Sequence, residues 1–170
     1  KYVHPGMKVL DMCTGSGCIL ISILKNVVDV EGFGYDISKQ ALNVAKGNAK
    51  LNNVNATFEC SDLFEEVTES FDVIVSNPPY IPTAVIGTLM PEVAVYEPMQ
   101  ALDGKEDGLY FYEKIITSAF EYLNANGKLL FEIGHDQGES VSNLMREAGY
   151  KDVRVVKDLA GNDRVVIGGL

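Results

Sequence analysis

Short apolar runs alternate along this chain with segments that have helical spacing, and this alternation restricts the fold more than any other feature of the sequence. The predicted strands are Lys8–Met12, Glu31–Asp36, Thr57–Ser61, Phe71–Ser76, Gly127–Ile133, Asp152–Lys157 and Arg164–Gly168. The first two predicted helices are Cys18–Asn26 and Ser38–Leu51. Because strands separated by helices pair in parallel, the pattern predicts an α/β fold with a mostly parallel sheet.

The second half of the chain continues the pattern with two amphipathic helices and two closing strands. Helical spacing of apolar residues predicts the first helix; these residues are Leu109, Tyr112, Ile116, Ala119 and Leu123. The second helix is predicted to open at Asp136, which with Glu139 has the spacing of a capping box, and to end at Gly149. Its apolar residues are Val141, Leu144 and Met145. The short link between the last two strands predicts that they form an antiparallel pair.

The stretch Ile81–Glu106 interrupts the alternation. It contains Pro82, Pro91, Pro98 and Gly104 and has no clear periodicity. Loops this long inside a compact domain commonly serve as lids or binding loops. The alternative interpretation is a surface loop without a function.

Length and charge exclude several classes of protein. With 170 residues and 46% apolar composition, the chain is long enough for one full core, and it has no apolar run long enough to span a bilayer. Fourteen basic and 24 acidic residues give a net charge of −10. This charge would repel a phosphate backbone and argues against nucleic acid as the main partner.

The cysteines and histidines indicate neither disulfides nor a metal. Cys13, Cys18 and Cys60 are odd in number and have no C-x-x-C spacing, so a reducing cytosol is the expected location. His4 and His135 lie far apart and have no carboxylate at ligand spacing, so no metal site is predicted. The chain opens on Lys1 a few residues before its first strand, and we expect that an upstream part of a longer protein is missing.

A glycine-containing loop and a following acid predict a nucleoside site. Asp11–Gly17 joins the first strand to the first helix and lets backbone N–H groups approach a ligand. Leu20 stands where a dinucleotide fingerprint needs its third glycine, which disfavours NAD and FAD. Asp36 ends the second strand, where an acid binds ribose hydroxyls. Alternatively, Asp36 caps the next helix, a role that Ser38 could fill instead.

Asp62 ends the third predicted strand and would lie over the same edge of the sheet as the glycine-containing loop and Asp36. A carboxylate there can accept a hydrogen bond from an adenine amino group, and apolar neighbours can cover the ring. The alternative role for Asp62 is a turn-forming residue. Leu63 and Phe64, which follow it, could equally belong to the core.

Asn77-Pro78-Pro79-Tyr80 follows the buried strand Phe71–Ser76 directly. Proline has a fixed φ and no N–H donor, so two in succession hold an Asn amide, bare carbonyls and an aromatic ring in one stiff turn. Strand ends of this kind face ligands in open α/β sheets. The turn is therefore suited to binding a planar NH₂ group.

Together these motifs, in this order and spacing, resemble the class I S-adenosylmethionine-dependent methyltransferases that modify planar amino or amide nitrogens, and the similarity covers the whole chain. Further motifs resemble the HemK/PrmC family of release-factor glutamine methyltransferases. These are Glu97-Pro98 with Ala101-Leu102, Asp107-Gly108-Leu109, Glu132-Ile133-Gly134 with Gln137-Gly138, and Asp158-Leu159-Ala160-Gly161 with Asp163-Arg164-Val165-Val166. A sister branch that methylates a ribosomal-protein glutamine shares the glycine-containing loop and the Asn-Pro-Pro-Tyr, but the closing segments are more similar to the release-factor branch.

The resemblance implies the class I methyltransferase (Rossmann-like) fold, in which a mostly parallel seven-stranded sheet has an antiparallel C-terminal strand. It implies that residues 1–170 form the catalytic domain and that the family's small helical N-terminal domain, which bears on substrate docking, is absent from them. Cys13 stands where many relatives have glycine, so we expect its backbone to adopt a conformation open to a side chain.

The resemblance also assigns the cofactor site. It implies that Cys13, Thr14, Gly15, Ser16 and Gly17 wrap the methionine end of S-adenosylmethionine. Asp36 then holds the ribose, and Asp62 and Leu63 meet the adenine. Asn77 touches cofactor and substrate alike.

A glutamine amide nitrogen is a poor nucleophile, because its lone pair is delocalised into the carbonyl. Hydrogen-bond acceptors that face both of its N–H groups stabilise the charge that develops on the nitrogen in the transition state. We expect the Asn77 side-chain oxygen and the Pro78 carbonyl to accept these hydrogens, and the Tyr80 ring to pack on the amide plane. Pro79 completes the substrate-binding turn, and no separate strong base is required.

The predicted function is methyl transfer to the glutamine N5 of the Gly-Gly-Gln loop of class I peptide-chain release factors, with S-adenosylhomocysteine as product. The named substrate follows only from the resemblance. Alternatives are the ribosomal-protein glutamine methyltransferases and the adenine-N6 nucleic-acid methyltransferases, which flip a base into a similar pocket. A noncatalytic nucleoside-binding scaffold and a dinucleotide oxidoreductase are further alternatives.

Overall fold

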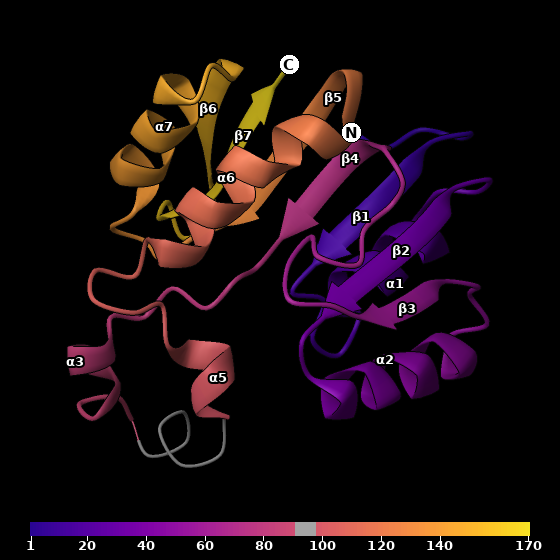
Figure 1. Ribbon diagram of the computed structural model, residues 1–170, viewed down its shortest axis with the longest axis horizontal. Coiled ribbons are helices and arrows are strands. Elements are labelled where there is room, and N and C mark those ends of the chain that lie inside the picture. Colours follow the sequence, from indigo (N-terminus) through magenta and orange to yellow (C-terminus); the bar gives the residue numbers. More distant parts are fainter. Residues whose placement is uncertain (91–97) are drawn as a thin grey trace.

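The computed structural model describes residues 1–90 and 98–170, and these contain one seven-stranded sheet (Figure 1). The strand order is β3-β2-β1-β4-β5-β7-β6. The strands are β1 (Lys8–Met12), β2 (Glu31–Asp36), β3 (Thr57–Cys60), β4 (Phe71–Ser76), β5 (Leu123–Glu132), β6 (Lys151–Lys157) and β7 (Asp163–Gly169). Strands β1 to β5 pair in parallel, and β7 runs antiparallel to both of its neighbours, β5 and β6. The predicted mostly parallel sheet with an antiparallel C-terminal strand is confirmed.

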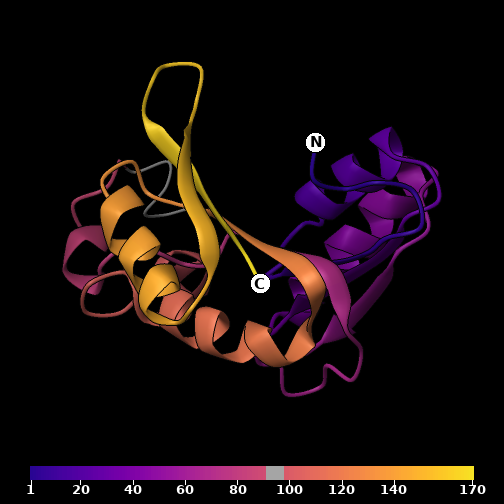
Figure 2. The same ribbon diagram turned by 90° about the horizontal axis from the view of Figure 1, so that it is seen from above.

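Helices cover both faces of the sheet, as Figure 2 shows from above. The described helices are α1 (Cys18–Asn26), α2 (Lys39–Leu51), α3 (Thr83–Ile86), α5 (Met99–Leu102), α6 (Tyr110–Tyr122) and α7 (Gly138–Glu147). Alternation along β1 builds two cores, because Val9 packs with α1 and α2 whereas Leu10 and Met12 pack with α6 and α7 on the other face. Among the described helices, none combines the length and apolar character needed to cross a bilayer.

The strand order places a switch point between β1 and β4. From β1 the chain proceeds outward through β2 to β3, and it then returns to the other side of β1 to form β4. Connections from β1 and β4 therefore leave in opposite directions. In open α/β sheets, ligands bind at the carboxyl ends of the strands at such a switch point.

Several predicted element boundaries differ from those in the structure, and for β5 a tertiary contact explains the difference. Strand β5 begins at Leu123, not Gly127, because Leu123 pairs with Phe71 at the start of β4. The predicted capping box is also wrong: α7 begins at Gly138 with Gln137 as its N-cap residue and has no side-chain cap, while the Asp136 side chain is exposed. Helix α7 ends at Glu147, two residues before the predicted Gly149.

The irregular stretch after β4 is anchored at its base. Ile81 forms an isolated parallel bridge with Asp103; its N–H donates to the Leu102 carbonyl (3.0 Å) and its carbonyl accepts from Gly104 N–H (2.8 Å). The predicted absence of regular structure is wrong for two short helices, α3 and α5, each of four residues. Pro91 and Glu97 lie outside the described residues.

Candidate functional site

Four connections meet at the carboxyl edge of the sheet. Ser76, the last residue of β4, donates its hydroxyl to the Met12 carbonyl at the end of β1 (2.7 Å). The Thr14 N–H donates to the Tyr35 carbonyl of β2 (3.0 Å), and the Ser61 N–H donates to the Asp36 carbonyl (3.1 Å). These bonds tie neighbouring strand ends together. The loops that start there, with all the residues predicted for the cofactor, therefore share one edge.

In the loop after β1, every second residue has a left-handed backbone: Cys13 (φ 59°), Gly15 (φ 55°) and Gly17 (φ 78°). The expectation for Cys13 is wrong, because its backbone adopts a conformation that favours glycine. A Cβ at Gly15 would meet no atom within 4 Å, so this backbone is open to a ligand. A Cβ at Gly17 would lie 3.1 Å from the Ala45 Cβ, so Gly17 allows close packing instead.

Asp36 connects this loop to the start of α2. Its Oδ2 accepts from the Gly15 N–H (2.8 Å), and its Oδ1 accepts from the Ser38 N–H (2.8 Å). Ser38 caps α2 by accepting from the Ala41 N–H (3.2 Å), so the helix does not need Asp36 as its cap. A carboxylate has about four acceptor positions. Two remain, which matches the two hydroxyl donors of a ribose.

The connection after β3 presents Asp62 on the surface and buries Phe64. Asp62 is exposed, and Leu63 is half-buried with a left-handed φ of 49°. The Ser61 hydroxyl holds this bend by donating to the Leu63 carbonyl (2.7 Å). Phe64 stacks on Tyr122 with ring centroids 4.8 Å apart, so it is a core residue. Asp62 and Leu63 therefore stand at the same edge of the sheet as Asp36.

The turn Asn77-Pro78-Pro79-Tyr80 leaves β4 beside the loop that leaves β1, because Ser76 and Met12 are register partners. Asn77 is exposed, Pro78 is buried, and Pro79 and Tyr80 are half-buried. Burial raises the pKa of the Tyr80 phenol, and the nearby Glu132 carboxylate raises it further. The phenol is therefore neutral near pH 7. An exposed amide next to a glycine loop is available to both ligands of a transfer reaction.

Asp11, for which no role was predicted, is a fully buried carboxylate at the end of β1. Its Oδ2 accepts from the Thr14 hydroxyl (2.7 Å) and the Leu20 N–H (3.3 Å) in the first turn of α1. Its Oδ1 has no hydrogen-bond partner among the described residues. Burial, and then the charge of Asp36, raise the pKa of Asp11 to about 7. The sequence signal for it was a charged residue between the apolar Leu10 and Met12 of the strand.

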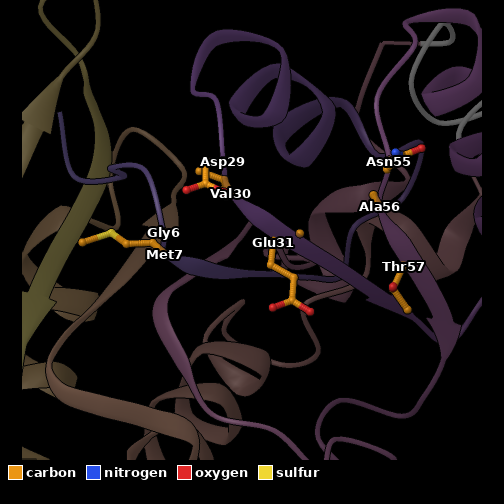
Figure 3. A pocket seen from close by; sticks show the side chains of 9 residues that line it. Gly6, Met7, Asp29, Val30, Glu31, Asn55, Ala56 and Thr57 are labelled. Carbon is orange, nitrogen blue, oxygen red and sulfur yellow. The ribbon is translucent and has the colours of Figure 1, made fainter.

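A cavity of about 450 Å³ lies at the opposite edge of the sheet (Figure 3). Residues before or at the start of β1, β2 and β3 line it, among them Met7, Glu31 and Thr57. A second cavity, of about 430 Å³, lies against the sheet face between α1 and strands β4, β5 and β7. The lining of neither cavity includes the glycine loop, Asp36 or Asn77, so neither belongs to the candidate site.

The sheet order and the antiparallel β7 are those of the class I methyltransferase fold. The chain belongs to the methyltransferase small domain family, whose model matches residues 3–94. Solved structures agree on the fold: a methyltransferase from Pyrococcus furiosus has a TM-score of 0.74 at 21% identity, with 99% of this chain and 77% of that chain covered. The T. thermophilus 16S rRNA N2 G1207 methyltransferase, solved with AdoMet and guanosine, has a TM-score of 0.69 at 17% identity, with 98% and 38% covered.

Curated relatives confirm the similarity to the release-factor glutamine methyltransferases. The chain is 46% identical over 166 residues to the release factor glutamine methyltransferase of Thermodesulfovibrio yellowstonii, covering 96% of this chain and 60% of the relative. It is 46% identical over 164 residues to the enzyme of the same name from Clostridium botulinum, covering 94% and 58%. The chain thus spans about 60% of the length of these relatives.

Proposed function

We propose that this chain transfers a methyl group from S-adenosylmethionine to the N5 of the glutamine in the Gly-Gly-Gln loop of class I peptide-chain release factors. The observation that carries the proposal is the exposed Asn77 amide, which begins a two-proline turn directly beside the glycine loop. The names of the curated relatives support the substrate. A net charge of −10 disfavours the nucleic-acid alternative.

The donor set at the edge fits this cofactor. The open backbone of Cys13–Gly17 and the buried Asp11 carboxylate suit the methionine end with its ammonium group. Asp36 has two acceptor positions left for the ribose hydroxyls, and Asp62 with Leu63 accommodates the adenine. When bound, S-adenosylmethionine supplies the methyl group from a positively charged sulfonium and leaves as S-adenosylhomocysteine.

The residues of the turn orient the glutamine amide. The Asn77 side-chain oxygen and the Pro78 carbonyl accept hydrogen bonds from its two N–H groups. The neutral Tyr80 ring packs on the amide plane, with Pro79 beside it. The methylated nitrogen then releases one of these two protons to water, and until its release this proton stays on the nitrogen in a hydrogen bond to its acceptor. Positioning and preorganised acceptors supply most of the barrier reduction.

We further propose that residues 1–170 act as the catalytic domain in the cytosol and that the helical N-terminal domain of the family is not among them. We then expect these residues alone to bind the cofactor, but to bind the release factor more weakly than they would together with the helical domain. Calorimetry with S-adenosylmethionine and a KM measurement for the release factor separate these two effects.

Mass spectrometry of a release factor incubated with the chain and labelled cofactor tests the proposal. We expect one added methyl on the glutamine of the Gly-Gly-Gln loop and none on a release factor in which that glutamine is alanine. Methylation of a ribosomal protein or an adenine-containing oligonucleotide instead would assign the chain to one of the alternative classes.

The Asn77→Ala variant tests the mechanism. Loss of one preorganised acceptor, worth about 3 kcal/mol, should lower kcat about 100-fold with little change in cofactor affinity. Asn55→Ala, at the exposed opposite edge (Figure 3), is the matched control and should leave kcat unchanged. Near wild-type turnover of Asn77→Ala in a single-turnover assay would remove Asn77 from the mechanism.

A further inference from the structure

The side chain of Gln137, the N-cap residue of α7, joins three segments that are far apart in the sequence. It is only 9% exposed. Its Nε2 donates to the Tyr80 carbonyl (3.1 Å) and to the Gly108 carbonyl (3.3 Å). Its Oε1 accepts from the Gly134 N–H (3.0 Å) and lies 3.5 Å from the Tyr112 hydroxyl, which donates its hydrogen over the shorter distance to the Glu132 carbonyl (2.9 Å). The last residue of the Asn77–Tyr80 turn is thus bonded to the loop after β5 and to the segment before α6.

Only an amide satisfies this set of partners. Gln has two N–H donors and an acceptor oxygen on one planar group, and here both donors and the oxygen are used. The two carbonyls need donors, whereas the Gly134 N–H needs an acceptor. A carboxylate would place an oxygen against two carbonyl oxygens, and an apolar side chain would leave these buried groups unpaired.

Two glycines bring the other segments close to the backbone of Tyr80. A Cβ at Gly108, where φ is +77°, would overlap the Tyr80 carbonyl oxygen and lie 2.9 Å from the Gln137 Nε2. A Cβ at Gly104 would lie 2.7 Å from the Tyr80 Cα. The turn is therefore enclosed on its C-terminal side, while Asn77 at its other end stays exposed.

We propose that Gln137 is a positioning residue that fixes the Asn77–Tyr80 turn through the Tyr80 carbonyl. Its role in catalysis rests on the proposed function of that turn. The two prolines between Asn77 and Tyr80 have fixed φ angles, so few backbone torsions of the turn can rotate to absorb a shift of Tyr80. Such a shift therefore displaces the acceptor atoms of Asn77 and Pro78. A displacement of about 1 Å at a reacting centre can cost about 100-fold in rate.

Hydrogen exchange tests the positioning without any substrate. Gln137→Met keeps the length of the side chain and removes its hydrogen bonds. We expect the Ile81 and Gly104 amides, which bond across the base of the segment after the turn, to exchange at least about tenfold faster in this variant. Asn143→Leu removes an exposed amide from the same helix and should leave these rates unchanged. Unchanged exchange at both amides in Gln137→Met overturns the proposal, whatever the substrate is.

Kinetics test the consequence for the reaction. Gln137→Met should lower kcat on the release factor about 10- to 100-fold while the cofactor Kd stays within about threefold, because the glycine loop and Asp36 lie on other elements. Wild-type kcat in this variant overturns the catalytic role. If the unaltered chain does not methylate the release factor, the proposed function fails, and the exchange rates still decide whether Gln137 holds the turn.

Gln137→Glu separates positioning from a loss of structure. Burial and the two facing carbonyls raise the pKa of the introduced carboxyl, and its protonated form regains one donor. Ionisable residues bordering this network include Tyr80, Tyr112, Glu132, Asp136, Asp163 and Arg164. Because the variant and the wild type share these residues, the ratio of their kcat values reports the titration of the introduced carboxyl alone. We expect this ratio to rise at least about tenfold from pH 8 to pH 6, and a ratio independent of pH overturns the proposal.

Discussion

Replacing Asp11 by Asn should remove a pH dependence of the free energy of unfolding that burial of this carboxyl imposes. Asp11 is fully buried, and its pKa rises from the ordinary 3.8 to about 7. A raised pKa means that the folded state binds the proton more tightly than the unfolded state does. The stabilisation is complete below the unfolded pKa and is lost as the pH rises through about 7. Each pKa unit corresponds to about 1.4 kcal/mol, so the total loss is about 4 kcal/mol.

Chemical denaturation at about pH 5 and about pH 8 measures this effect. Between these values the wild-type chain should lose about 2.5 kcal/mol of unfolding free energy relative to Asp11→Asn, whose amide does not titrate and can still accept from the Thr14 hydroxyl. Asp136→Asn removes the same charge from an exposed side chain and is the control. If wild type and Asp11→Asn changed in parallel from pH 5 to pH 8, Asp11 would not be the buried proton-binding group.

Three further substitutions test the loop, the ribose acceptor and the core. Gly17→Ala should cost about 2–3 kcal/mol in chemical denaturation, because φ is +78° and the new Cβ would meet packed side chains. Asp36→Asn should weaken S-adenosylmethionine binding about 10- to 100-fold in calorimetry, while kcat at saturating cofactor changes little; unchanged affinity would exclude the ribose role. Phe71→Ala should cost about 3–5 kcal/mol, because Phe71 is 0% exposed and packs edge-to-face on Phe33 at 5.5 Å. Leu159→Ala, at a fully exposed position, should stay within about 0.5 kcal/mol of wild type in the same denaturation assay.

The apolar pattern predicted most of the sheet: β1 and β4 are short, mostly apolar runs, and β2 and β3 each place aromatic residues between polar or glycine neighbours. Where the prediction failed, a partner distant in sequence decided the outcome. Leu123 keeps the spacing of α6, yet its pairing with Phe71 makes it the first residue of β5. The four-residue helices α3 and α5 are too short to show a period.

The candidate site was predictable where the strand ends alone determine it. The glycine loop, Asp36, Asp62 and Asn77 each follow a parallel strand, so the rule that carboxyl ends share an edge was enough to group them. Gln137 was not predictable as a partner of the turn, because its contacts with Tyr80 and Gly108 depend on how α7 packs. The left-handed backbone of Cys13 was missed because only the residue type suggested its conformation.

The insertion of β7 between β5 and β6 has a consequence for biosynthesis. Among the described strands, β6 pairs with β7 alone, and β7 comes later in the chain. While the ribosome is still adding residues 163–169, β6 has no neighbour to join and the edge of β5 remains uncovered. The β5–β7–β6 part of the sheet can therefore form only after β7 has been synthesised. A nascent chain stalled before Asp163 would expose the unpaired edge of β5, to which other chains could hydrogen-bond.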